Sequence, residues 1–187
     1  MAELLGADLS ALDTAVLMID GLNVAGEMIV VALVITADGT KVPVGLRLGD
    51  AENTLVVKDL LADLVDRGLR FEHGILAVLD GSKALRKAVG KVFGAKALIQ
   101  RCTLHKRRNV TGYLHRGGAS QSHRQRLAGI FANADAAAGL RDARRQARSI
   151  NTKYGGMPSS VIEPAEVIEM SSCWHPDAAS CSATRIA

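Results

Sequence analysis

Two aspartates, each followed by glycine, are the residues of this sequence best suited to bind a divalent metal ion. Asp20 ends the apolar run from Ala15 to Asp20, and Asp80 ends the run from Gly74 to Asp80. Carboxylates at the ends of neighbouring parallel strands can share cations, and two such ions activate the attacking oxygen and stabilise the leaving one in phosphoryl transfer. The glycines leave room for a phosphate backbone. Asp-Gly pairs are also common turns, so either pair alone favours a turn.

The segment from Gln100 to Asn109, QRCTLHKRRN, holds the next group of chemically active residues. Cys102 and His105 have a spacing that suits zinc, but a tetrahedral site needs more ligands, and no second close pair follows before the C-terminal tail. We therefore interpret Cys102 as a buried thiol at a strand end. The candidate DNA-binding residues form a cap and a cationic turn that faces phosphate: His105, Lys106, Arg107, Arg108 and Asn109.

Positive charge is concentrated between Arg101 and Arg148, although the formal net charge of the chain is only +4. Asp135 and Asp142 are the acidic residues of this segment. Its basic residues are Arg101, Lys106, Arg107, Arg108, Arg116, Arg124, Arg126, Arg141, Arg144, Arg145 and Arg148. Such an imbalance suits a phosphate backbone, so nucleic acid is the predicted partner, with a solvated helix face as the alternative.

The elements that must position the first aspartate are three strands. The apolar run that ends at Asp20 and the β-branched run from Glu27 to Thr36 predict the first two. Asp38-Gly39 is a hairpin turn signal, and the segment from Lys41 to Leu48 alternates as a returning strand. Its Pro43 indicates an exposed edge. These strands predict an antiparallel meander.

Alternating helices and strands follow the meander. The pattern predicts a helix from Asn53 to Arg67, a strand from Gly74 to Asp80, a helix from Ser82 to Phe93, a strand from Ala95 to Cys102 and a helix from near Leu104. This order is that of a ribonuclease-H-like α/β fold, a mixed sheet of a three-strand antiparallel meander plus parallel strands with flanking helices. A right-handed crossover makes the fourth strand parallel to the first, so both aspartates lie at one sheet edge.

Bulk composition indicates a soluble, cytoplasmic protein. The 187 residues are 48% hydrophobic, which is enough for a core, and no apolar run reaches the roughly 18 residues needed to span a membrane. The start of the chain lacks the sections of a secretory signal. Three unevenly placed cysteines argue against a disulfide framework and fit a reducing compartment.

Several motifs recur here in a characteristic order. VLDGSKAL occupies residues 78–85, VFG residues 92–94 and QRCTLHKRRNVTGY residues 100–113, with Ile19-Asp20-Gly21 and Asp50-Ala51-Glu52-Asn53 upstream. Together, over about Val16 to Leu114, they resemble the core signature of mutator-type insertion-sequence transposases.

The resemblance implies an Asp-Asp-Glu enzyme that cuts element ends with water and joins them to target DNA, using Mg²⁺ or Mn²⁺. Asp20 and Asp80 match the first two carboxylates of the family and are the expected catalytic residues and metal ligands. The third, a glutamate in an asparagine-glutamate-arginine context, has no counterpart in the sequence. Glu163, Glu166 and Glu169 lack that context, so the role is assigned to none of them.

The resemblance also implies a division of the chain. Residues 1–114 are expected to form a partial catalytic core, residues 115–153 a basic helical region, and residues 154–187 a disordered or frameshifted tail. The resemblance implies that the chain is a truncated or frameshifted copy, which departs from the family frame after about Leu140. Such a copy is expected to be inactive. Element ends and target DNA are the implied partners. The sequence does not distinguish a monomer from a homo-oligomer.

Three other functions remain as alternatives. A ribonuclease-H-like nuclease or junction resolvase would cut branched DNA without joining strands. A non-catalytic DNA-binding remnant would bind DNA without metal. An aspartate-nucleophile phosphatase is disfavoured because Leu22 stands two residues after Asp20, where that class has a second aspartate.

Overall fold

The computed structural model describes residues 5–51, 53–116, 121–131, 133 and 135–154. The chain divides into two compact units, the first ending at Arg101 and the second beginning at Cys102. The helix that follows Cys102 contacts a later helix of the second unit.

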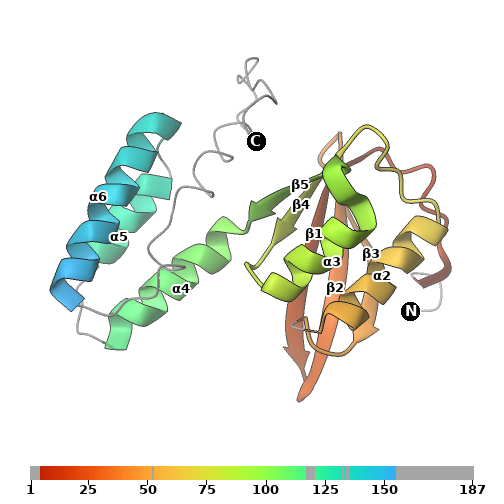
Figure 1. Ribbon diagram of the computed structural model, residues 1–187, viewed down its shortest axis with the longest axis horizontal. Coiled ribbons are helices and arrows are strands. Elements are labelled where there is room, and N and C mark those ends of the chain that lie inside the picture. The colour runs from red at the N-terminus through yellow and green to blue at the C-terminus, as the bar shows by residue number, and fades with distance from the viewer. Residues whose placement is uncertain (1–4, 52, 117–120, 132, 134, 155–187) are drawn as a thin grey trace. The chain divides into compact units, whose positions relative to one another are not determined.

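The first unit is built on a mixed sheet (Figure 1). Its strands are β1 (Thr14–Val24), β2 (Glu27–Thr36), β3 (Lys41–Leu48), β4 (Ile75–Leu79) and β5 (Ala97–Arg101), in the spatial order β3-β2-β1-β4-β5. β1, β2 and β3 pair antiparallel, which confirms the meander, whereas β4 lies parallel to β1 and β5 parallel to β4. Pro43 lies on the edge strand β3, as expected, because proline within a sheet is found mainly on edge strands.

The first strand is longer than the sequence predicts. β1 continues through Asp20 and Gly21 to Val24, because its pairing with β2 runs on to the end of the hairpin. The turn lies instead at Ala25 and Gly26, whose φ angles are 54° and 90°. Positive φ at both central residues is typical of a two-residue hairpin turn that matches the twist of the strands. The Asp20-Gly21 pair is therefore strand, not turn.

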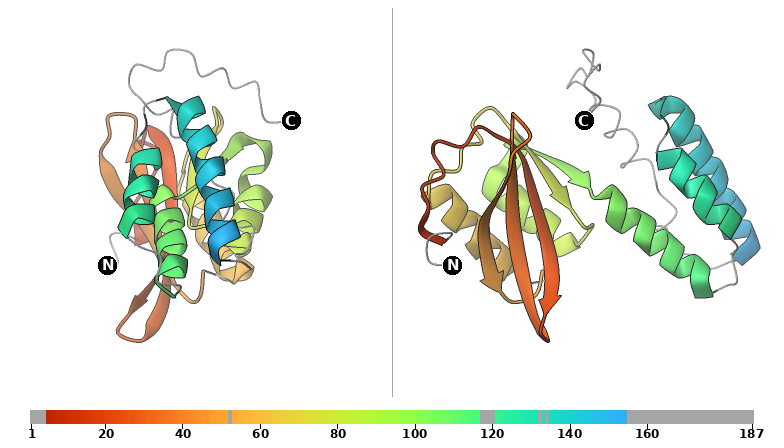
Figure 2. Two further views of the ribbon diagram at one scale, coloured as in Figure 1. Left: turned by 90° about the vertical axis from the view of Figure 1, so that its left-hand side faces the viewer. Right: turned by 180° about the vertical axis from the view of Figure 1, so that it is seen from behind.

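Two helices cover one face of the sheet and pack against each other (Figure 2). α2 (Thr54–Asp66) begins after Asn53, whose side chain accepts a hydrogen bond from the Leu55 amide at 3.0 Å. α3 (Lys83–Phe93) is followed by a 3-10 turn, η1 (Gly94–Lys96), that leads into β5. Asparagine and serine caps satisfy amide groups that the first helical turn leaves without partners, so both predicted helix starts are confirmed.

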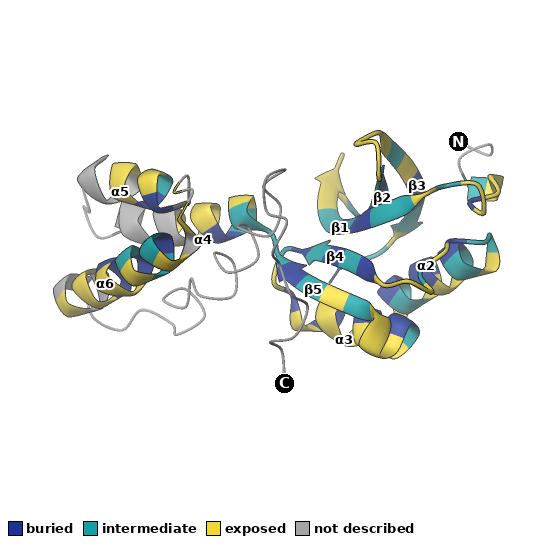
Figure 3. Ribbon diagram, turned by 90° about the horizontal axis from the view of Figure 1, so that it is seen from above, coloured by how far each residue is buried: buried dark blue, intermediate teal, exposed yellow. Residues whose placement is uncertain are grey.

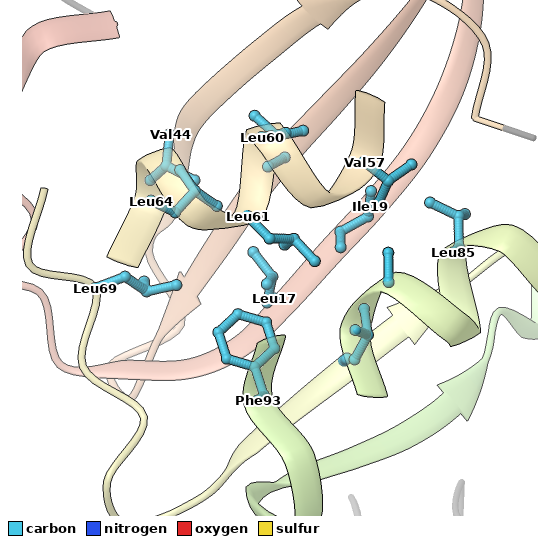
Figure 4. Packing of buried hydrophobic residues seen from close by; sticks show 14 of the residues in the cluster. Leu17, Ile19, Val44, Val57, Leu60, Leu61, Leu64, Leu69, Leu85 and Phe93 are labelled. Atoms are coloured by element: carbon cyan, nitrogen blue, oxygen red, sulfur yellow. The ribbon is translucent and has the colours of Figure 1, made fainter. Parts of the chain in front are cut away.

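The hydrophobic core lies between this face of the sheet and the two helices (Figures 3 and 4). Leu17 and Ile19 of β1, Leu61 of α2 and Phe93 of α3 are at most 3% exposed. Phe93 meets Phe71 edge to face, with 4.8 Å between the ring centroids. Because side chains alternate along a strand, Asp20 lies on the face opposite to Leu17 and Ile19.

Charged side chains attach α2 to the edge strand. The Arg47 guanidinium of β3 contacts the carboxylates of Asp59 at 2.7 Å and Asp63 at 3.3 Å. Arg67, at the end of α2, contacts Asp63 at 3.0 Å and donates a hydrogen bond to the Val44 carbonyl. The hydrogen bond that the Arg47 guanidinium donates to the Asp59 carboxylate raises the pKa of Arg47. These bonds fix where α2 lies along β3.

The described part of the second unit is helical. It comprises α4 (Thr103–Arg116), α5 (Gln121–Phe131) and α6 (Ala136–Tyr154). α5 and α6 pack through Ile130 and Ala143. Residues 155–187, which the expected tail includes, lie outside the described residues. None of the helices in the described ranges is long and apolar enough to cross a membrane.

Candidate active site

Asp20 is held in the middle of a continuous strand. It lies opposite Val31 of β2 in the antiparallel ladder, and its neighbours Ile19 and Gly21 are paired as well. Its side chain is half-buried. Pairing within the sheet therefore fixes the backbone of Asp20, from which the carboxylate extends.

Asp80 is held by the start of a helix. It follows Leu79, the last residue of β4, and its Oδ1 accepts a hydrogen bond from the Ser82 amide at 2.6 Å. The Ser82 hydroxyl in turn accepts hydrogen bonds from the Ala84 and Leu85 amides, at 3.2 and 3.4 Å. One short turn thus caps α3 and orients the Asp80 carboxylate.

The strand register brings the two aspartates together. The parallel ladder between β1 and β4 ends at the pair Ile19 and Leu79, so Asp20 and Asp80 are the next residues in register. Neighbouring strands lie about 4.8 Å apart. The structure therefore places Asp20 and Asp80 side by side, as the sequence predicts, at the carboxyl end of β4, although β1 continues beyond Asp20.

Arg101 lies against the glycine that follows Asp80. A Cβ built on Gly81 would stand 2.5 Å from Arg101 Nε and 2.8 Å from Cζ, so the guanidinium occupies the space of the missing side chain. Leu79 and Arg101 are paired across β4 and β5, which explains this contact. The sequence shows Arg101 as one of many basic residues and does not reveal that it lies near Asp20 and Asp80, at what we call the aspartate edge, because the contact depends on the pairing of two strands.

The loop after β3 lies against the other Asp-Gly pair. A Cβ on Gly21 would stand 2.8 Å from the Cβ of Ala51, which is 4% exposed. The motif Asp50-Ala51-Glu52-Asn53 therefore lies beside the residue that follows Asp20, although Glu52 is outside the described residues. The room at Gly21 is taken by this loop.

Two carboxylates suit a hard divalent cation, because such ions prefer oxygen ligands. Among the described residues, no group of three histidine, cysteine, aspartate or glutamate side chains is arranged to hold a metal ion. Asp20 and Asp80 would hold such an ion from one side. Glu163, Glu166 and Glu169 lie outside the described residues.

The candidate DNA-binding residues lie on different faces of α4. Arg107, Arg108 and Asn109 are exposed, whereas His105 is half-buried and the Lys106 side chain is only 1% exposed. Helical spacing explains the exposure of Arg107 and Arg108, since residues 102, 105 and 106 share a face that 107 and 108 do not, whereas Asn109 lies on the face of 105 and 106 and is nevertheless exposed. The expectation that Lys106 faces phosphate is therefore corrected, and the expected buried thiol, Cys102, is half-buried.

The sequence profile of the transposases of the mutator family matches residues 8–169, which is most of the chain. The chain belongs to the mutator family of transposases. The match extends beyond Leu140, from which a departure from the family frame was expected.

A curated member of these transposases shows the same relationship. The transposase for insertion sequence element IS6120 of Mycolicibacterium smegmatis is 36% identical to this chain over 113 residues. The aligned part covers 57% of this chain and 34% of the relative. The chain thus spans about a third of the length of that transposase.

The contact between Gly81 and Arg101 in this transposase chain predicts an effect of Gly81→Ala. Gly81 and Gly39 have φ angles of 104° and 88°, so alanine at either is expected to lower the free energy of unfolding by about 1–2 kcal/mol. Gly39 has no atom within 4 Å of a built Cβ, whereas at Gly81 the guanidinium must move. Urea unfolding measures the first effect, and the Arg101 Nε–Hε NMR signal the second. Gly39→Ala is the control, and an unmoved signal in Gly81→Ala would contradict the contact.

Proposed function

We propose that this chain carries part of the catalytic domain of an Asp-Asp-Glu DNA transposase with a ribonuclease-H-like fold. The strand register that places Asp20 beside Asp80 is the observation that carries the proposal. The strand order β3-β2-β1-β4-β5, with β2 antiparallel to its neighbours, supports the fold. Membership of the mutator family supports DNA as substrate and transposition of an insertion sequence as the process.

Asp20 and Asp80 are the proposed ligands of Mg²⁺ or Mn²⁺. When bound, these ions would activate the attacking oxygen and stabilise the leaving oxygen during strand cleavage and strand transfer. Asp20 supplies a carboxylate whose backbone is fixed by β2, and the Ser82 amide holds one oxygen of Asp80 in place. Fixed ligand geometry is what this chemistry requires of the protein.

Arg101 and α4 are proposed to receive DNA. The Arg101 guanidinium lies against Gly81, the residue that follows Asp80, and so brings positive charge to an edge that otherwise carries two carboxylates. This positive charge lowers the electrostatic repulsion that a DNA phosphate meets there. The exposed residues Arg107, Arg108 and Asn109 are suited to backbone contacts, which position DNA without reading its bases.

Metal binding tests the shared carboxylate site. In calorimetry with Mn²⁺, Asp80→Asn is expected to weaken binding at least about tenfold, since neutralising one of two ligands removes a charge and fixed geometry. Asp66→Asn is the matched control, because Asp66 is exposed at the C-terminal end of α2. Equal Mn²⁺ affinity in wild type and Asp80→Asn would contradict a shared site.

A second candidate is a DNA-binding protein without catalytic activity. The observation that favours it is that the described residues offer two carboxylates at this edge and no three-ligand group. Such a protein would bind DNA equally well with and without divalent metal, and it would leave the strands intact.

A further inference from the structure

Four arginines lie along one face of α6. Arg141, Arg144, Arg145 and Arg148 are all exposed, and they follow one another at the spacing i, i+3, i+4 and i+7. At 3.6 residues per turn these positions fall within about 100° of arc and extend over about 10 Å of the helix axis. We call these four residues the arginine stripe.

The packing of α6 against α5 fixes the direction of the stripe. Ala143, Gln146 and Ala147 are at most 9% exposed, and Ala143 packs with Ile130 of α5. Helical spacing places the buried residues about 150° around the axis from the centre of the stripe. The arginines therefore project away from the helix on which α6 packs.

The chemistry of the stripe suits phosphate. Asp142 lies at its border and contacts Arg145 at 2.8 Å, but Arg145 is still 77% exposed. Among the described residues, those that continue the exposed face are small, Ala137 and Thr152, and the four residues of the stripe include no apolar or aromatic side chain of the kind found at the centre of a protein interface. Arginine binds phosphate oxygens with two parallel hydrogen bonds.

We propose that the arginine stripe of α6 binds the phosphate backbone of duplex DNA without sequence preference. This proposal shares with the proposed function the assumption that the partner is DNA. Binding by the stripe does not require a metal ion or the carboxylates of Asp20 and Asp80. The stripe is a contact additional to the exposed residues of α4, and it acts by neutralising consecutive phosphates along the duplex.

Fluorescence anisotropy with a labelled random-sequence 30-base-pair duplex, in EDTA, tests the proposal on the 187-residue chain. In the triple variant Arg141→Ala/Arg144→Ala/Arg148→Ala the log-log salt slope is expected to fall by about 2.7, or 0.9 per phosphate contact. The ratio of Kd at 200 mM salt to Kd at 50 mM salt then shrinks about 40-fold. Alanine favours helix more than arginine does, so α6 is retained, which circular dichroism checks.

The matched control removes the same charge elsewhere. Lys41→Ala/Lys87→Ala/Lys91→Ala removes three exposed lysines of the first unit and is expected to keep the wild-type slope. Replacing the three arginines by lysine should retain most of the slope, because an ammonium also neutralises a phosphate. An unchanged slope in the alanine triple variant would overturn the proposal. The proposal would also be overturned if this variant lost binding to poly-glutamate, used as a probe for an acidic protein surface, but still bound DNA like wild type. Because the assay contains EDTA, its result does not depend on metal binding at Asp20 and Asp80, which separates this test from that of the metal site.

Discussion

The 187-residue chain is expected to leave pre-cut element ends unjoined to a supercoiled target, in Mg²⁺ or in Mn²⁺. The described residues place two carboxylates at the aspartate edge, and two ligands hold a pair of ions poorly in the geometry that phosphoryl transfer needs. A longer chain that also carries the downstream glutamate segment of the family is expected to join strands. In that longer chain, Asp20→Asn or Asp80→Asn should lower the joining rate about a thousandfold, which corresponds to about 4 kcal/mol.

The same assay distinguishes the remaining functions. Cutting of branched DNA without any joining, by the longer chain, would favour a nuclease or resolvase. If the 187-residue chain joins strands as fast as the longer one, a third carboxylate is present within it. Glu163, Glu166 and Glu169 would then be the residues to replace.

Truncating the core beneath the site should have the largest effect on stability. Leu61 is fully buried in α2 against the sheet, and Leu61→Ala is expected to lower the free energy of unfolding by about 2–5 kcal/mol, through lost burial and the cavity left behind. Leu55 lies on the same helix but is 74% exposed, so Leu55→Ala should change it by at most about 0.5 kcal/mol. Urea unfolding of both variants measures the difference. Similar losses in the two would contradict the burial pattern of α2.

Much of the first unit follows from local sequence patterns. The bounds of β2 and β3 agree with the predicted strands, and Asn53 and Ser82 cap the helices that they were expected to start. Each of these features depends on neighbouring residues, namely β-branched alternation, an Asp-Gly turn or a side chain that accepts from an amide. The alignment of Asp20 with Asp80 also follows, once a right-handed crossover is assumed.

Features that depend on distant residues could not be predicted in this way. The signal at Asp20-Gly21 indicated a turn, but pairing with β2 outweighed it and moved the turn to Ala25 and Gly26. The contact of Arg101 with Gly81 requires two strands in register. The burial of Lys106 depends on which face of α4 is covered, which its sequence of consecutive basic residues does not reveal.

The two aspartates differ in what can move them. Asp20 is paired in the ladder with β2, so it can shift only if several hydrogen bonds of the sheet open together. Asp80 lies beyond the end of its own strand, and it is hydrogen-bonded to Ser82 in the short turn that begins α3. A small tilt of α3 would carry Asp80 with it and leave Asp20 in place. A change in the spacing between the two carboxylates would therefore come from movement of Asp80, while Asp20 keeps its position in the sheet.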